Sequence, residues 1–201
     1  AAPGGLSLGG SGRFLFHAYT GAVRVFTTGA SGELTLSGTI TGFAGASGIN
    51  AEHPSGRFGY MTNIAGAGNT VYAYTIDQTT GLLTSAGTIA AGTNTGVVRV
   101  EPKGRYAYVS NRASNDIYAS AIDPVSGALS FISSHACGGG VLLASIDPTA
   151  RFVYAPGSAG TTLSAFNING DGTLSLSQTA TAGNNPIFAA LVNFQLWPAV
   201  D

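Results

Sequence analysis

The sequence predicts an all-β fold of repeated four-stranded antiparallel sheets, and three observations support this. A short turn followed by two aromatic residues, spaced two apart, occurs four times in the 201 residues. Successive arginines of these copies are separated by 44, 48 and 46 residues. No stretch shows a helical period, and Gly, Ser and Thr crowd the segments between alternating apolar runs. A strand-rich repeat of about 45 residues is typical of the blades of a β-propeller.

The first strand of each blade is a short apolar run before the marker turn, such as residues 96–100 or 141–146. The second strand carries two aromatic side chains that share one face, because side chains alternate along a strand. These pairs are Phe14/Phe16, Phe58/Tyr60, Tyr106/Tyr108 and Phe152/Tyr154. We expect the pairs to occupy equivalent positions and to pack between neighbouring sheets.

The third strand alternates as well, as in residues 71–76, and its equivalents begin at Val23, Ile117 and Leu163. The fourth strand follows a glycine turn in every copy, at Gly32, Gly81, Gly127 and Gly172. The sequence therefore predicts one propeller or partial-propeller domain over residues 1–201, with blades at about 5–42, 48–90, 96–135 and 140–180.

Residues 186–201 follow the fourth blade as a further strand and a tail. The strand, residues 187–192, carries no charge that would blunt an exposed edge. We expect it to pair as an inner strand, either with the first blade or with a neighbouring copy. The predicted architecture is thus four blades plus one strand.

Composition excludes several classes of function. Only 8% of residues are charged, against about 25% in an average soluble domain, and the net charge of −1 gives no attraction to nucleic acid. No apolar run approaches the ~20 residues of a membrane span. The single cysteine, Cys137, excludes an internal disulfide, and no spacing suggests a metal site or a cofactor. Low charge and many Ser and Thr residues favour a secreted or extracellular protein, with a cytoplasmic one as the alternative.

Four arginines recur at one position of the repeat, and their sameness favours a structural role over ligand binding. They are Arg13, Arg57, Arg105 and Arg151. We expect them to pair with a recurrent acid, such as Asp77 or Asp123, or with turn carbonyls.

Residues that break the repeat are better candidates for a site. Asn50, Glu52 and Arg99 stand on predicted inner strands where the other blades mostly carry Leu, Val, Ala or Ser. A carboxylate at Glu52 and a guanidinium at Arg99 could activate water and orient a lactone or sugar acid, with Asn50 and Arg99 binding the ligand. A solvated rim or a local ion pair is the alternative.

Two segments of the repeat carry a resemblance to known proteins. Residues 102–111 read PKGRYAYVSN and residues 121–129 read AIDPVSGAL, and residues 60–63 and 75–82 echo them as YMTN and TIDQTTGL. This pattern resembles the lactonase-type seven-bladed propellers, which include 6-phosphogluconolactonase-like and carboxymuconate-cyclase-like proteins, and the YVTN repeats of surface proteins. The resemblance covers nearly the whole chain, and it implies a propeller in which enzymes place His, Arg and Glu near the mouth of the channel.

The chain departs from that family in two respects. Seven blades of about 46 residues need more than roughly 300 residues, and this chain has 201. The family often opens an inner strand with Pro-His, whereas the openings here read Gly48-Ile49, Gly96-Val97 and Gly139-Gly140-Val141.

Three functional hypotheses follow. The first is a non-catalytic module that binds copies of itself or another propeller segment through its blade faces and its last strand. The second is a lactonase-like hydrolase that acts on a sugar lactone or sugar acid, with a small carbohydrate-like ligand as partner. The third is a partial propeller without an independent function.

Overall fold

A computed structural model describes residues 5–9, 12–19, 21–43, 46–63 and 69–187. Within these ranges the chain forms antiparallel strands and no helix, which confirms the all-β prediction. The strands form four sheets of four, and in each sheet the spatial order follows the sequence. The structure is therefore a series of four blades, fewer than the seven of a complete lactonase-type propeller.

The first two sheets contain β1 (Leu6–Leu8), β2 (Phe14–Tyr19), β3 (Gly21–Thr28), β4 (Leu34–Phe43), and then β5 (Ala46–Glu52), β6 (Phe58–Asn63), β7 (Thr70–Ile76), β8 (Leu83–Ala90). The last two contain β9 (Thr95–Val100), β10 (Tyr106–Asn111), β11 (Asp116–Ile122), β12 (Leu129–Ala136), and then β13 (Ser145–Ile146), β14 (Phe152–Pro156), β15 (Thr162–Ile168), β16 (Leu174–Thr181).

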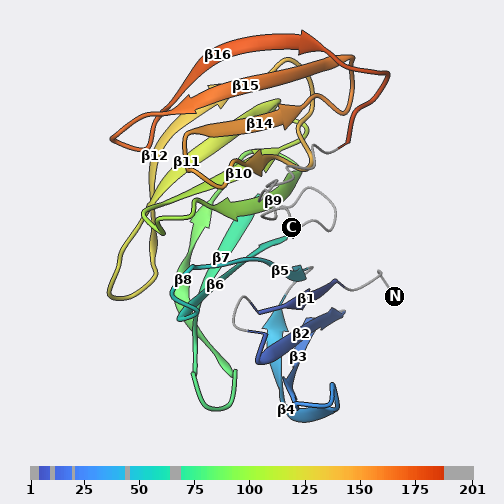
Figure 1. The fold of residues 1–201 in the computed structure, drawn as a ribbon, viewed down its shortest axis with the longest axis vertical. Coiled ribbons are helices and arrows are strands. Elements are labelled where there is room, and N and C mark those ends of the chain that lie inside the picture. The colour runs from blue at the N-terminus through green and yellow to red at the C-terminus, as the bar shows by residue number, and fades with distance from the viewer. Residues whose placement is uncertain (1–4, 10–11, 20, 44–45, 64–68, 188–201) are drawn as a thin grey trace, which may run out of the picture.

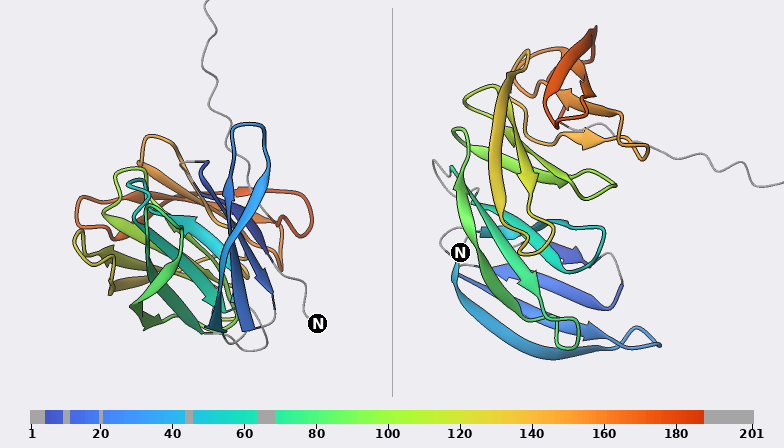
Figure 2. Two further views of the ribbon diagram at one scale, coloured as in Figure 1. Left: turned by 90° about the horizontal axis from the view of Figure 1, so that it is seen from below. Right: turned by 90° about the vertical axis from the view of Figure 1, so that its left-hand side faces the viewer.

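The blades follow one another along an open arc, with the first and fourth blades at its two ends (Figures 1 and 2). The first strands of neighbouring blades, such as β5 and β9, contact one another, so they form the inner side of the arc. An apolar cluster fills each of the three blade interfaces. Burial of apolar side chains between successive sheets therefore holds the arc together.

The aromatic pairs occupy equivalent positions, as predicted. Those of the first three blades lie in the interfaces, where every ring except the half-buried Tyr106 is buried. Phe152 and Tyr154 of the fourth blade are only half-buried, because no further blade follows them in the described chain. The prediction of packing between sheets is thus confirmed wherever a following sheet is present.

The first strand of the fourth blade is shorter than the predicted 141–146. Strand β13 covers only Ser145–Ile146, preceded by an isolated bridge between Val141 and Gly157. Ser110 Oγ donates to the carbonyl of Leu142 at 2.8 Å, and Arg99 Nε donates to that of Ala144 at 3.3 Å. These carbonyls bond to the third blade, which interrupts the ladder with β14. The extra strand predicted over residues 187–192 lies, from residue 188 on, outside the described residues.

Candidate functional site

The same contact between an aromatic ring and a glycine joins every pair of neighbouring blades. The glycine that opens the fourth strand of one blade lies against the first aromatic ring of the preceding blade. A methyl group would lie 2.6 Å from Phe14 if added to Gly81, 2.4 Å from Phe58 if added to Gly127, and 2.4 Å from Tyr106 if added to Gly172. All three glycines also have positive φ. Both the backbone and the space therefore require glycine.

Tyrosine hydroxyls extend two of these contacts. Tyr60 Oη donates to the carbonyl of Gly127, and Tyr108 Oη to that of Gly172, each at 3.0 Å. Burial raises the pKa of both phenols, so they remain protonated donors over the whole working pH range. Tyr106 Oη adds a bond of 2.8 Å to the carbonyl of Gly170. We call the ring, the glycine and, where present, the hydroxyl bond the aromatic–glycine contact.

Each recurrent arginine covers the ring that follows it. The distance from Cζ to the ring centroid is 5.2 Å in the first blade, 5.1 Å in the second, 5.0 Å in the third and 5.1 Å in the fourth. Arg57 also donates to the turn carbonyl of Val125 at 3.5 Å, and Arg105 Nε lies 3.6 Å from Glu101 Oε1. This arrangement fits the structural role that the repetition of these arginines suggested.

Asp77 and Asp123 bond to their own turns instead of to arginine. Asp77 Oδ1 accepts the amide N–H of Thr80 at 2.7 Å, and Asp123 Oδ1 accepts that of Ser126 at 2.7 Å. These hydrogen bonds lower the pKa of both carboxyls. In the described part of the chain neither aspartate pairs with an arginine. Arg57 uses the expected turn carbonyl, whereas Arg105 pairs with an acid other than the two that were named, Glu101.

The acids that do bond to the marker turn were missed by the sequence analysis. Fully buried Glu101 accepts the amide N–H groups of Lys103 and Arg105, each at 2.8 Å. Asp147 stands at the equivalent position and accepts the amide of Arg151 at 2.6 Å. The signal was an acid followed by proline, four residues before the recurrent arginine, in the third and fourth blades.

Glu52 and Arg99 contact different neighbouring blades. Glu52 faces the first blade, since a methyl group on Gly9 would lie 2.8 Å from its Oε2 atom. Half-buried Arg99 faces the fourth blade through its bond to the carbonyl of Ala144, and burial lowers the pKa of its guanidinium. The structure therefore does not bring this pair together at one interface. The side chain of Asn50 lies outside what is described, and the proposed roles of all three stay predictions.

Two grooves open between the third and fourth blades. One, of about 360 Å³, lies between the turns that carry Lys103, Arg105 and Arg151. The other, of about 510 Å³, lies between Arg112, Leu142, Ser158, Ala159, Asn185 and Ile187. Glu52 and Arg99 line neither groove. Within the described ranges, no three His, Cys, Asp or Glu side chains are grouped as a metal site would require, and no helix has the length and apolarity to cross a membrane.

Comparisons with known proteins agree with this architecture. The family model described as "Lactonase, 7-bladed beta-propeller" matches residues 53–191. No curated protein matches the chain significantly.

Several solved structures share the fold. A protein from Lactobacillus plantarum matches with a TM-score of 0.82 and 20% identity over 92% of this chain and 57% of its own. A putative 6-phosphogluconolactonase from Bacteroides fragilis matches with a TM-score of 0.82 and 20% identity, and the match covers 94% of this chain and 57% of that protein. The periplasmic gluconolactonase of Pseudomonas aeruginosa matches with a TM-score of 0.58 and 17% identity, and the match covers 92% of this chain and 71% of that protein.

At these identities the solved structures show the fold alone. The chain spans 57% of the length of the first two, which corresponds to four blades of a seven-bladed ring. The family model, in contrast, matches well over half of the chain and includes most of the second, third and fourth blades. The chain therefore belongs to the lactonase family of seven-bladed β-propellers.

Proposed function

We propose that the chain acts as a propeller module that binds blades of its own type through the two end faces of its arc. One observation carries this proposal. The two halves of the aromatic–glycine contact that joins its internal blades are both present, without a described partner, at opposite ends of the molecule.

The first blade presents the glycine half. Gly32 has the positive φ of its equivalents, but nothing lies within 4 Å of a methyl group added there. Leu34 is 53% exposed, whereas the equivalent Leu83 and Leu174 are 7% and 5% exposed against a preceding blade. On the inner strand of the same face, Leu6 is 68% exposed. This face is shaped like an interface but has no described neighbour.

The fourth blade presents the aromatic half. Phe152 and Tyr154 are half-buried, and among the described residues no group bonds to the Tyr154 hydroxyl. An apolar face of this kind favours association, because its burial removes apolar surface from water. By the geometry of the internal interfaces, the ring of Phe152 would lie on Gly32 of a neighbour, and Tyr154 Oη would donate to the carbonyl of that glycine.

Such an association uses two different faces and is therefore heterologous, so it can extend or close into a ring. The partner is a second copy of this chain or another propeller segment that presents the same two half-contacts. Association would also cover both sheet faces at the ends of the arc.

Sedimentation velocity over a range of protein concentrations tests the proposal. The wild type is expected to form dimers and larger species as concentration rises. Leu34→Lys blocks the first face and Tyr154→Lys blocks the other, so each variant alone is expected to remain a monomer. Mixed together, the two variants still offer one intact face each and are expected to form a heterodimer. A wild type that stays monomeric at all concentrations, or single variants that associate like the wild type, would contradict the proposal.

A second candidate function is lactonase-like hydrolysis of a sugar lactone or sugar acid. The match to the lactonase family model favours it, as do the names of the relatives from Bacteroides fragilis and Pseudomonas aeruginosa. Glu52 is the candidate general base for water, and Arg99 is the candidate group that orients the carboxyl or stabilises the oxyanion.

Titration of the acid released from glucono-δ-lactone, corrected for spontaneous hydrolysis, tests this candidate. If Glu52 and Arg99 act as suggested, Glu52→Gln and Arg99→Gln abolish the enzymatic rate, while Glu33→Gln leaves it unchanged because Glu33 bonds within its own turn. A wild-type rate equal to the spontaneous rate would contradict lactonase activity. Together with a strictly monomeric chain, that result would favour a partial propeller without an independent function.

A further inference from the structure

The open face of the first blade carries two residues that break the repeat. On strand β2, Phe14, Phe16 and Ala18 pack toward the second blade, so the residues between them point to the other face, at the end of the arc (Figure 1). His17 is one of these residues, and its cross-strand partner on β3 is Arg24. Both side chains therefore belong to the first-blade face that we propose as an interface.

The later blades carry no charge at the equivalent cross-strand position. The pairs there are Met61 with Tyr72, Val109 with Tyr118, and Ala155 with Ser164. In each pair the residue on the second strand of the blade is at most 1% exposed, because a preceding blade covers it. A blade that packed on the first blade in the same way would therefore cover His17 and Arg24.

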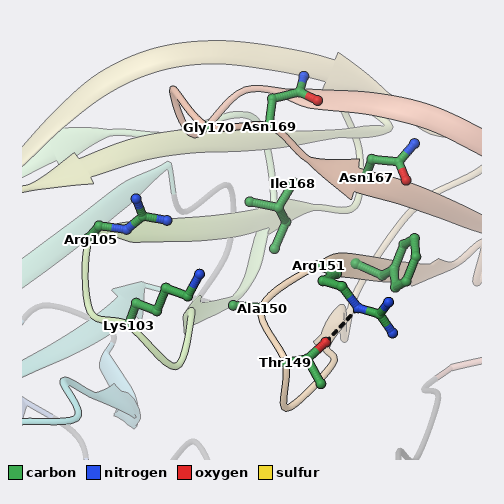
Figure 3. Close-up of a pocket in the computed structure, with 10 residues that line it drawn as sticks. Lys103, Arg105, Thr149, Ala150, Arg151, Asn167, Ile168, Asn169 and Gly170 are labelled. Carbon is green, nitrogen blue, oxygen red and sulfur yellow. Dashed lines mark hydrogen bonds between the residues drawn. The ribbon is translucent and has the colours of Figure 1, made fainter.

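Arg24 is an exposed cation that has no carboxylate beside it. Its Cζ atom lies 5.1 Å from the centroid of the Tyr19 ring, which stacks on His17 with a centroid distance of 5.8 Å. Strands β1–β4 contain no acidic residue, and among the described residues no acceptor bonds to this guanidinium. In the fourth blade, by contrast, Arg151 Nε donates to Thr149 Oγ1 at 2.8 Å (Figure 3). The hydrogen-bonding capacity of Arg24 is thus available to a partner.

A partner that lacks an acceptor would remove this guanidinium from water without replacing its hydrogen bonds, which costs free energy. The fourth blade of this chain is such a partner. Its strands, β13–β16, contain no acidic residue. Its two described acids, Asp147 and Asp171, accept hydrogen bonds within their own turns. A second copy of the chain can therefore cover the apolar part of the first-blade face but leaves Arg24 unmatched.

We infer that the first-blade face recognises a propeller blade that carries an aspartate or glutamate opposite Arg24. Its preferred partner is then a propeller segment of different sequence and not a second copy of this chain. A guanidinium pairs with a carboxylate through two parallel hydrogen bonds, and His17 adds an N–H donor beside it. Such a pair selects between partners, because a neutral or positive face cannot replace the carboxylate. The inference rests on the proposed association and specifies its partner.

The internal interfaces show which position of a neighbouring blade lies opposite this pair. Met61, the equivalent of His17, packs in one cluster with Ala18 and Val23 of the preceding blade. These two residues are cross-strand partners on β2 and β3, and the equivalent pair of the fourth blade is Pro156 with Leu163. Leu163 is half-buried on the open fourth blade. In a docked copy, the side chain at position 163 would therefore lie opposite His17 and Arg24.

The substitution Leu163→Glu makes the chain itself a probe for the expected chemistry. One component is Tyr154→Lys, which offers only its first-blade face, and the other is Leu34→Lys, which offers only its fourth-blade face. Calorimetric titration of one into the other measures the dissociation constant. Adding Leu163→Glu to the Leu34→Lys chain is expected to lower that constant about tenfold, the effect of one charge-assisted hydrogen-bonded pair. Leu163→Gln is the matched neutral control and is expected not to tighten binding.

Replacement of Arg24 completes a double-mutant cycle. Arg24→Tyr, made in the Tyr154→Lys chain, restores the residue that the second and third blades carry at this position, Tyr72 and Tyr118. It is expected to tighten binding of the fourth-blade face that retains Leu163, because the unmatched charge is gone, and to abolish the gain from Leu163→Glu. Because Arg24 is exposed, this arm remains informative even if position 163 does not tolerate a charge.

Three results would overturn the inference. They are a Leu163→Glu chain that binds no more tightly than Leu163→Gln, a gain from Leu163→Glu that survives Arg24→Tyr, and an Arg24→Tyr chain that binds Leu163 more weakly than its parent does. Self-association of the wild type without a gain from Leu163→Glu would leave the proposed function intact and refute only the choice of partner. A pair that binds only when Leu163→Glu is present would support the choice of partner and exclude the second copy. Thermal unfolding of each variant shows whether it folds.

Discussion

Replacing Tyr108 by phenylalanine removes one hydroxyl from the interface between the third and fourth blades. The hydroxyl donates to the carbonyl of Gly172 at 3.0 Å, and both residues are buried. The substitution keeps the ring, so the packing against Gly172 is retained. What changes is one hydrogen bond and the partner of one buried carbonyl.

The magnitude follows from that loss. A buried hydrogen bond contributes about 1 kcal/mol, and a buried acceptor left without a partner costs about 1–3 kcal/mol. We therefore expect Tyr108→Phe to lower the free energy of unfolding by about 2 kcal/mol. With an unfolding entropy of about 2.1 cal/mol/K per residue, this corresponds to a fall in Tm of roughly 5 °C.

Two other tyrosines form a graded series with Tyr108. Tyr106→Phe removes a hydrogen bond of 2.8 Å at a half-buried site, where water can replace the hydroxyl. We therefore expect it to lower the free energy of unfolding by about 0.5 kcal/mol. Tyr154→Phe removes a hydroxyl without a described partner at the open end and is expected to leave stability unchanged.

Urea unfolding followed by tyrosine fluorescence, at a protein concentration that keeps the chain monomeric, measures the series. The expected order of destabilisation is Tyr108→Phe, then Tyr106→Phe, then Tyr154→Phe. Equal effects for Tyr108→Phe and Tyr154→Phe would refute the assignment of stability to the hydroxyl bonds of the aromatic–glycine contact.

Three further predictions concern the same interfaces. Gly127→Ala is expected to lower the free energy of unfolding by about 3 kcal/mol, because the added methyl group meets the Phe58 ring and φ is positive. Gly32→Ala carries only the strain of positive φ and is expected to lower it by about 1 kcal/mol. Thermal unfolding compares the two variants. Glu101→Ala removes a fully buried carboxylate that accepts two turn amides, and it is expected to lower the free energy of unfolding by about 2 kcal/mol, measured by urea unfolding. Glu33→Ala, which replaces an exposed acid, is the control. His135 Nε2 accepts the amide N–H of Leu174, and burial lowers the pKa of His135, so the unfolded chain takes up the proton first. The free energy of unfolding should therefore fall as pH drops below about 6.5, the usual pKa of histidine. Urea unfolding at pH 7 and pH 5.5 should show that the stability of His135→Gln depends less on pH than that of the wild type.

The fold was predictable because its information is local and repeated. A turn, an aromatic pair and a glycine recur at constant offsets, and each marks the same strand in every blade. The shortening of β13 was not predictable in this way, because it depends on Ser110 and Arg99 of another blade, whose side chains bond to its carbonyls. Tertiary contacts of this kind leave no mark in the local pattern.

The candidate site shows more clearly what a local sequence pattern cannot predict. Departure from the repeat singled out Glu52 and Arg99 as candidate site residues. It did not show that they face opposite blades, since the direction of a side chain depends on strand register, and β5 contains register shifts near Ile49. Conversely, the role of Glu101 could have been inferred from its place before Pro102 in the marker turn.

The three interfaces are unequal, and this sets the order in which the arc should come apart. The first has Phe16 where the other two have tyrosine, so it has no hydroxyl bond of this kind, whereas the second has that of Tyr60 and the third those of Tyr106 and Tyr108. Where modules contact only their neighbours, the total free energy is close to a sum of module and interface terms. The first blade should therefore detach at lower free energy than the fourth, and its amides should exchange hydrogen fastest. Partial unfolding would then proceed from the amino-terminal end, leaving three folded blades with a new exposed face on the second.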